Sequence, residues 1–143
     1  MAKKEFAFST RLRVRWAEVD QQGIVFNGHY MTYFDVGVTE YYRAIGITYT
    51  GPLNESGTDL YLKKAELEYH ASAQYDDFID IYVRVRKIGN SSFEFAIENY
   101  RDDLLLVSGA LVYVNAEPES RRSVKVPKFF RDAIISFERI TPK

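Results

Sequence analysis

The chain has 143 residues, 46% apolar and 27% charged, which is typical of one soluble globular domain, so we expect a single domain over residues 1–143. Its 19 basic and 20 acidic side chains give a net charge of −1, which offers no electrostatic reason to bind nucleic acid or an anionic membrane. The absence of cysteine excludes disulfides, thiolate metal ligands and a cysteine nucleophile.

The first ten residues lack the apolar stretch of a signal peptide. No apolar run elsewhere reaches the length of a membrane span. We therefore expect a cytoplasmic protein with no transmembrane segment.

The first predicted element is a strand within residues 8–16. Arginines alternate there with Leu12, Val14 and Trp16, and a period of two is typical of a half-buried strand. Leu12, Val14 and Trp16 are accordingly predicted to share the buried face.

A long helix is predicted over about residues 27–45. Tyr30, Phe34 and Tyr41 recur at helical spacing, Asn27 is a candidate N-cap, and Gly46 stands where the helix would end. Its aromatic residues are poor helix formers, so we expect burial to stabilise it.

The second half of the chain is predicted to be strands. After a loop over about 46–59, with turn signals at Gly51-Pro52 and Ser56-Gly57, four apolar runs follow at about 61–71, 79–86, 93–98 and 104–114. The first three alternate, whereas the last is nearly continuous and predicts a central strand covered on both faces. The short joints favour antiparallel pairing, and residues 127–138 favour a terminal helix.

These elements predict an α+β fold in which a sheet of about five strands curls around one long helix. Such a sheet keeps an uncovered face and open edges. Association between subunits would cover both, so we expect a homo-oligomer that is at least a dimer, with a dimer of dimers (a homotetramer) as the favoured form.

Common catalytic motifs are missing from the sequence. There is no glycine-rich phosphate loop, no G-x-S-x-G and no H-E-x-x-H. His29 and His70 lack the local spacing of a metal site, so neither a metal nor another cofactor is predicted.

The segment whose residues could support catalysis is the loop before the long helix. Asp20 places a carboxylate in a loop that contains Gly23, just before Asn27 at the predicted helix start. A helix N-terminus offers unpaired N–H groups and the positive end of a dipole, both suited to an oxyanion. A loop aspartate more often caps or meets solvent, so this pattern by itself leaves both readings open.

The run Asp20-x-x-Gly23-Ile24-Val25-Phe26-x-x-x-Tyr30 resembles the signature of the 4-hydroxybenzoyl-CoA thioesterase family of hot-dog proteins. The similarity continues in the same order over roughly residues 8–115. It includes Phe34-Asp35 in the predicted helix and Gly89-Asn90-Ser91-Ser92 in a predicted hairpin.

The resemblance implies hydrolysis of an acyl-CoA substrate without a metal, in dimers or dimers of dimers with sites at the subunit interface. It implies that Asp20 acts as nucleophile or as general base, and that the backbone N–H of Asn27 polarises the thioester carbonyl. Val25, Phe26 and Tyr30 would shape the acyl pocket, and Gly23 would permit the tight path of the loop.

The chain departs from the pattern at two positions. Some relatives carry a histidine where this chain has Asn27, and His29 replaces a small or amide residue, so His29 is either part of the substrate site or a packed residue. Glu40 is a second catalytic candidate, since another hot-dog thioesterase branch uses a glutamate of the helix. Its place deeper in the helix favours an ion pair instead, with Arg43 as the candidate partner. The cations available for the CoA pyrophosphate are Lys63, Lys64, Arg84, Arg86 and Lys87.

Two other functions stay open. A hot-dog hydratase or dehydratase would need a histidine and a carboxylate that face the substrate together. A non-catalytic module that binds acyl-CoA or an acyl carrier would need no Asp20.

Overall fold

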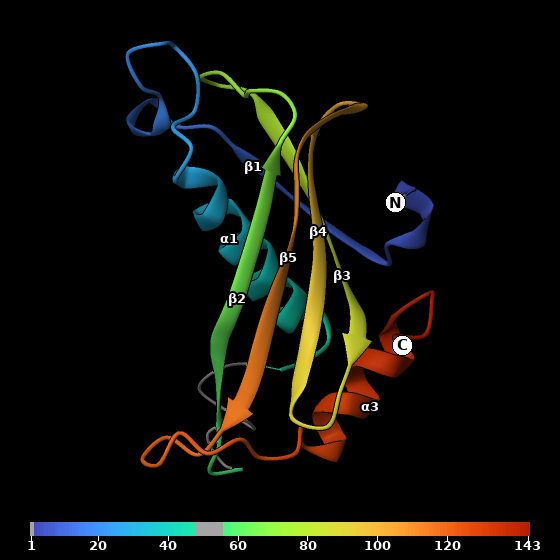
Figure 1. The fold of residues 1–143 in the computed structure, drawn as a ribbon. Coiled ribbons are helices and arrows are strands. Elements are labelled where there is room, and N and C mark those ends of the chain that lie inside the picture. Colours follow the sequence, from blue (N-terminus) through green and yellow to red (C-terminus); the bar gives the residue numbers. More distant parts are fainter. Residues whose placement is uncertain (1, 48–55) are drawn as a thin grey trace.

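The computed structural model describes residues 2–47 and 56–143, so the predicted turn at Gly51-Pro52 lies outside the described residues. The predicted order of a strand, a long helix, four strands and a terminal helix is confirmed (Figure 1). The strands are β1 (Phe8–Arg13), β2 (Asp59–Tyr69), β3 (Phe78–Ile88), β4 (Ser92–Arg101) and β5 (Leu104–Ala116). The helices are α1 (His29–Ala44) and α3 (Lys128–Phe137), with the 3₁₀ turns η1 (Lys3–Glu5) and η2 (Trp16–Glu18).

The five strands form one antiparallel sheet in the order β1-β3-β4-β5-β2. One face of this sheet packs against α1, which runs across it in Figure 1. The buried side chains between them are apolar or aromatic, including Ile81, Val83 and Phe95 from the sheet and Phe34, Val38 and Tyr41 from the helix. The predicted α+β architecture is therefore confirmed.

Two glycines let α1 lie directly on the sheet. A Cβ at Gly37 would lie 2.6 Å from Cγ2 of Ile81. A Cβ at Gly109 would lie 2.7 Å from the ring of Phe34 and 2.1 Å from the carbonyl oxygen of Glu66. A larger side chain at either position would displace the helix or a strand.

Helix α1 begins two residues later than predicted. Gly28 is the N-cap, no side chain caps the helix, and the predicted capping by Asn27 is wrong. The chain turns first, because the N–H of His29 donates to the carbonyl of Phe26 at 3.0 Å. The predicted end is close to the observed one, and Gly46 has a φ of +80°, as expected of a glycine that terminates a helix.

The predicted burial of Trp16 is also wrong. Strand β1 ends at Arg13, and Trp16 begins η2 with 74% of its surface exposed. Its ring meets the ring of Tyr75 edge to face at 5.2 Å. The alternation of β1 does not continue into this 3₁₀ turn, so Trp16 lies on the surface beside the loop of Asp20.

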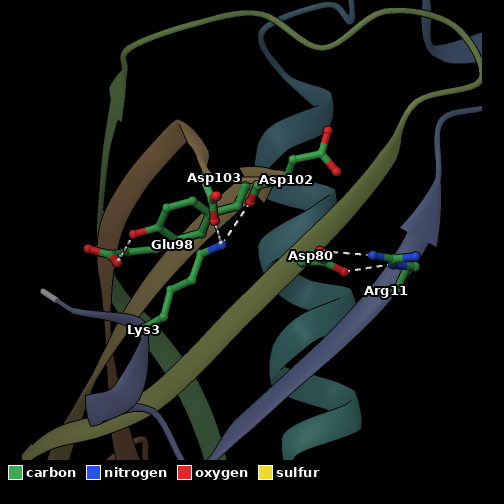
Figure 2. Close-up of polar contacts among 7 residues, drawn as sticks. Lys3, Arg11, Asp80, Glu98, Asp102 and Asp103 are labelled. Atoms are coloured by element: carbon green, nitrogen blue, oxygen red, sulfur yellow. Dashed lines mark hydrogen bonds and ion pairs between the residues drawn. The ribbon is translucent and has the colours of Figure 1, made fainter.

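The N-terminal segment covers part of the outer face of the sheet. Phe6 is buried against Tyr82, and the ammonium of Lys3 lies 4.4 Å from the centre of the Tyr100 ring. Figure 2 shows Lys3 reaching the turn after β4, where it donates to the carbonyl of Asp102 at 2.8 Å and to Asp103 at 3.2 Å. The figure also shows the ion pair between Arg11 and Asp80, which joins β1 to β3.

This cover accounts for part of a difference from the sequence pattern, at Tyr100. Alternation predicts a half-buried β4, whereas its residues from Phe95 to Tyr100 are all buried, including Glu98. Strand β5, predicted to be central, lies between β4 and β2 and is partly exposed at Ser108 and Gly109. Strand β4 is the central strand in hydrogen bonding as well as in burial.

The segment from α3 onward continues the edge of β3 beyond the first residue of β1, Phe8. The N–H of Ile88 donates to the carbonyl of Lys143, and the N–H of Lys143 donates to the carbonyl of Arg86. The buried carboxylate of Glu138 accepts from the N–H of Val85 at 3.0 Å and from the hydroxyl of Tyr41 at 2.5 Å. These contacts connect the terminal segment to both the sheet and α1.

Candidate active site

Asp20 lies at the tip of a tight hairpin between η2 and α1. Val19 pairs with Val25, and the N–H of Phe26 donates to the carbonyl of Glu18 at 3.0 Å. The tip closes where the N–H of Gly23 donates to the carbonyl of Asp20 at 3.0 Å. Gly23 has a φ of +79°, a conformation that favours glycine.

The Asp20 carboxylate is partly exposed and lightly bound. One oxygen accepts the N–H of Gln22 at 2.8 Å, and within the described part of the chain this is its single hydrogen-bond donor. A carboxylate can accept about four hydrogen bonds. Asp20 therefore keeps free lone pairs, which can accept a hydrogen bond from water or attack a carbonyl carbon.

A buried carboxylate holds this hairpin to α1. Glu18 is 5% exposed and accepts the hydroxyl of Tyr33 at 2.9 Å, the N–H of Arg15 at 2.8 Å and the guanidinium of Arg15 at 2.9 Å. Burial alone would raise the pKa of Glu18, but these hydrogen bonds and the positive charge of Arg15 outweigh it and lower the pKa. Glu18 therefore stays charged and fixes the base of the hairpin.

The start of α1 presents two unused backbone donors. The carbonyls of Phe26 and Asn27 accept the N–H groups of His29 at 3.0 Å and Tyr30 at 3.3 Å. The N–H groups of Asn27 and Gly28 donate to no acceptor among the described residues. Unpaired N–H groups at the N-terminus of a helix suit a negatively charged oxygen.

A small cavity of about 160 Å³ opens beside these donors. Its lining comes from the hairpin, the start of α1 and the end of β2, namely Val25, Asn27, Tyr30, Tyr69, His70, Ala71 and Ser72. Three predicted site residues, Val25, Asn27 and Tyr30, therefore meet at one cavity. The other four, Asp20, Gly23, Phe26 and His29, do not line it.

Tyr30 is a fixed wall of this cavity. Its hydroxyl accepts the N–H of Ala73 at 3.0 Å, and burial raises the pKa of the phenol. The neighbouring Phe26 is 53% exposed, and its ring meets that of His29 edge to face at 6.0 Å. His29 thus packs on Phe26 at the surface of the helix start.

Tyr69 and His70 belong to the cavity although the sequence pattern did not predict them. Alternation places His70 on the polar face of its strand, where its Nε2 lies 2.8 Å from the hydroxyl of Ser108. Tyr69 is the last residue of β2, and the pairing of β2 with β5 brings it to the start of α1. This pairing joins segments distant in sequence, so the alternation of one strand could not reveal it.

Most of the other candidate groups are paired or buried. Glu40 forms an ion pair with Arg43, as expected. Arg84 is buried, which removes it from the cations available to a bound pyrophosphate. Lys64 and Arg86 pair with Glu66 and Glu94. The described residues include no group of three or more histidines and carboxylates able to hold a metal ion.

The family of the chain follows from comparison with known sequences. The family model described as the thioesterase superfamily matches residues 22–108, more than half of the chain. The chain belongs to the thioesterase superfamily. The matched region begins in the Asp20 hairpin and includes α1, β2, β3 and β4.

Individual members of the superfamily are similar over most of the chain. The acyl-CoA thioesterase YbgC of Haemophilus influenzae is 24% identical over 121 residues, covering 85% of this chain and 89% of that protein. The structure of Slr0204, a 1,4-dihydroxy-2-naphthoyl-CoA thioesterase from Synechocystis, superposes with a TM-score of 0.82 at 17% identity, covering 89% of this chain and 94% of that one. The DHNA-CoA thioesterase of Staphylococcus aureus gives 0.78 at 20% identity, with 87% and 83% covered.

These structural similarities establish the hot-dog fold of this superfamily member. No helix in the described part of the chain is long and apolar enough to cross a membrane.

Proposed function

We propose that this protein hydrolyses an acyl-CoA thioester to a free acid and CoA. The observation that carries the proposal is the pairing of two features in one short segment. A carboxylate with free acceptor capacity, Asp20, lies at the tip of a hairpin whose outgoing arm leads directly to the unpaired N–H groups of Asn27 and Gly28. The names of the similar superfamily members support acyl-CoA as the substrate.

In the proposed reaction the carbonyl oxygen of the thioester accepts the N–H of Asn27. Asp20 either removes a proton from water as it attacks the carbonyl carbon or attacks that carbon itself. The resulting tetrahedral oxyanion collapses, the C–S bond breaks, and CoA leaves as a thiolate that takes up a proton. On the nucleophilic route, water then hydrolyses the acyl-aspartyl anhydride and restores Asp20.

The acyl group is proposed to lie against Val25 and Tyr30, with Phe26 at the rim. The Asp20 motif supports membership of the 4-hydroxybenzoyl-CoA branch within the superfamily. Val25 and Tyr30 would offer apolar walls to both aromatic and aliphatic acyl groups. A panel of substrates is therefore needed to identify the acyl group. We further propose a cytoplasmic location, where acyl-CoA is available.

The active form is proposed to be a dimer or a dimer of dimers. Strand β2 forms one edge of the sheet over eleven residues, and it exposes Leu62 and Tyr69. An open edge of this length favours pairing with a second strand. Asp20 does not line the cavity of its own chain, so a partner subunit against β2 is proposed to enclose the site.

The test is a panel of acyl-CoA thioesters, short and long, aliphatic and aromatic, with release of free thiol as the measurement. We expect hydrolysis of at least one substrate by the wild-type protein and its loss in Asp20→Asn. Binding of the panel without thiol release would favour a non-catalytic binding module instead. Hydration of an enoyl-CoA, lost in His29→Ala, would favour a hydratase.

A further inference from the structure

Tyr69 connects the edge strand to the start of α1. In the register of the sheet it pairs with Val107, a buried residue that packs toward α1, so the Tyr69 side chain lies on that face. Its hydroxyl donates to the carbonyl oxygen of Asn27 at 3.2 Å. Its ring meets the ring of Tyr30 edge to face, with centroids 5.7 Å apart.

The carbonyl that Tyr69 contacts belongs to the same planar peptide group as the N–H of Gly28. Tyr30 N–H approaches this carbonyl from within the helix at 3.3 Å, while Tyr69 approaches it from the sheet. With the carbonyl fixed by two donors, the Gly28 N–H must point the opposite way, out of the helix start. A hydrogen bond to the carbonyl also polarises the amide and strengthens its N–H as a donor.

The preceding peptide group has the same direction. The carbonyl of Phe26 accepts His29 N–H at 3.0 Å, so the N–H of Asn27 also points away from the helix. Consecutive N–H groups with a common direction form a concave anion site. The cavity lined by Asn27, Tyr30 and Tyr69 opens at this position.

We propose that Tyr69 is a positioning residue for thioester hydrolysis. Its hydroxyl holds the Asn27–Gly28 peptide group so that the Gly28 N–H joins the Asn27 N–H as a second donor to the oxyanion. The proposal rests on the proposed function and adds a residue and a second donor to it. When the carbonyl carbon is attacked, its π electrons move to the oxygen, and a donor fixed in advance stabilises that charge more than the neutral carbonyl.

The test is the variant Tyr69→Phe, which keeps the ring against Tyr30 and removes the hydroxyl. The lost hydrogen bond should lower kcat about two- to tenfold, because the net free energy of one hydrogen bond corresponds to a change of that size in a rate constant. KM should change by less than about twofold, because the hydroxyl acts on the transition state through a peptide group. The melting temperature should stay that of the wild type, since Tyr69 is half exposed.

The matched control is Tyr61→Phe on the same strand. Arg121 lies over the Tyr61 ring at 4.1 Å, a contact that the phenylalanine keeps, and Tyr61 is remote from Asn27 along β2. This variant should retain the kcat of the wild type. If removing any tyrosine hydroxyl from β2 disturbed the structure, kcat would fall in both variants.

The outcomes distinguish a failure of the positioning role of Tyr69 from a failure of the proposed thioester hydrolysis. If the wild type hydrolyses thioesters, Asp20→Asn is inactive and Tyr69→Phe keeps the full kcat, the positioning role is wrong and the proposed function stands. A rise in KM without a fall in kcat would likewise overturn it. If the wild type hydrolyses no thioester of the panel, both proposals fail together.

Discussion

The hydroxyl of Tyr33 in α1 donates to the buried carboxylate of Glu18, which lies at the base of the Asp20 hairpin, at 2.9 Å. Glu18 also accepts two hydrogen bonds from Arg15 and uses its carbonyl to receive Phe26 N–H. The base of the hairpin and helix α1 are therefore fixed to each other through one residue, Glu18. Groups that must meet one carbonyl need such a rigid support.

We expect Glu18→Gln to destabilise the protein by about 1–3 kcal/mol, because the amide nitrogen would face the guanidinium of Arg15 without an acceptor. Tyr33→Phe removes only one hydrogen bond and should cost about 1 kcal/mol. Denaturant unfolding measures both. Equal stability of Glu18→Gln and the wild type would show that the carboxylate does not hold the hairpin.

Glu18 should also contribute to acid unfolding. Its pKa in the folded protein lies below the ordinary value of 4.5, so its stabilising contribution is present above pH 4.5 and is lost as the pH falls through the folded pKa. The stability difference between wild type and Glu18→Gln should therefore shrink below pH 4.5.

Glu138 should have the opposite pH dependence. Burial raises its pKa, more than the hydrogen bonds from Tyr41 and Val85 and the charge of Arg84 lower it. The folded protein then binds a proton more tightly than the unfolded chain, so this group reduces stability as the pH rises from 4.5 through its folded pKa. Glu138→Gln should remove this loss.

Melting curves of wild type and Glu138→Gln from pH 5 to pH 8 test the point. The stability of the variant relative to the wild type should increase toward pH 8. A constant difference over this range would mean that Glu138 does not titrate there with a raised pKa.

Backbone and side chain of Asn27 can be separated by two variants. Asn27→Ala keeps the N–H, and because the side chain does not cap α1 its stability should stay within about 0.5 kcal/mol of the wild type, with a mild loss of activity. Asn27→Pro removes the N–H and should lower kcat by about 10²–10³-fold, the usual effect of losing one oxyanion donor. Equally severe losses in both would assign the role to the side chain.

Assembly is tested by light scattering at micromolar concentration. We expect a mass of at least two chains of 16.6 kDa each. Leu62→Lys, on the open edge of β2, should weaken the assembly, whereas Leu104→Lys, similarly exposed at the start of β5, should not. A wild-type protein that stays a 16.6 kDa monomer would contradict the proposed dimer.

The sequence predicted the order of elements because alternation and helical spacing are local signals. It did not predict the exposure of Trp16, since η2 interrupts the alternation of β1. It also did not predict the burial of both faces of β4 from Phe95 to Tyr100, where Lys3 packs on Tyr100 from a distant segment. The helix start was misplaced because Gly28, not Asn27, is the N-cap.

In the site, the loop before α1 was recognisable from Asp20 and Gly23, which lie within four residues, whereas its hairpin pairing of Val19 with Val25 was not predicted. Tyr69 and His70 were not, because their approach to α1 follows from the pairing of β2 with β5. Contacts between distant segments depend on the fold, and a single strand pattern does not contain them.

The most direct test of Asp20 as the catalytic group is the kcat of Asp20→Asn at saturating acyl-CoA, with the melting temperature recorded. The amide keeps the size of the side chain and can still accept Gln22 N–H, so the fold should persist. It can neither deprotonate water nor attack the carbonyl, so kcat should fall by about 10²–10⁴-fold or more while KM changes little. Asp103→Asn, which loses only a surface ion pair with Lys3, is the control and should keep full activity. A folded Asp20→Asn protein with kcat within about threefold of the wild type would contradict the assignment of Asp20 as the catalytic group.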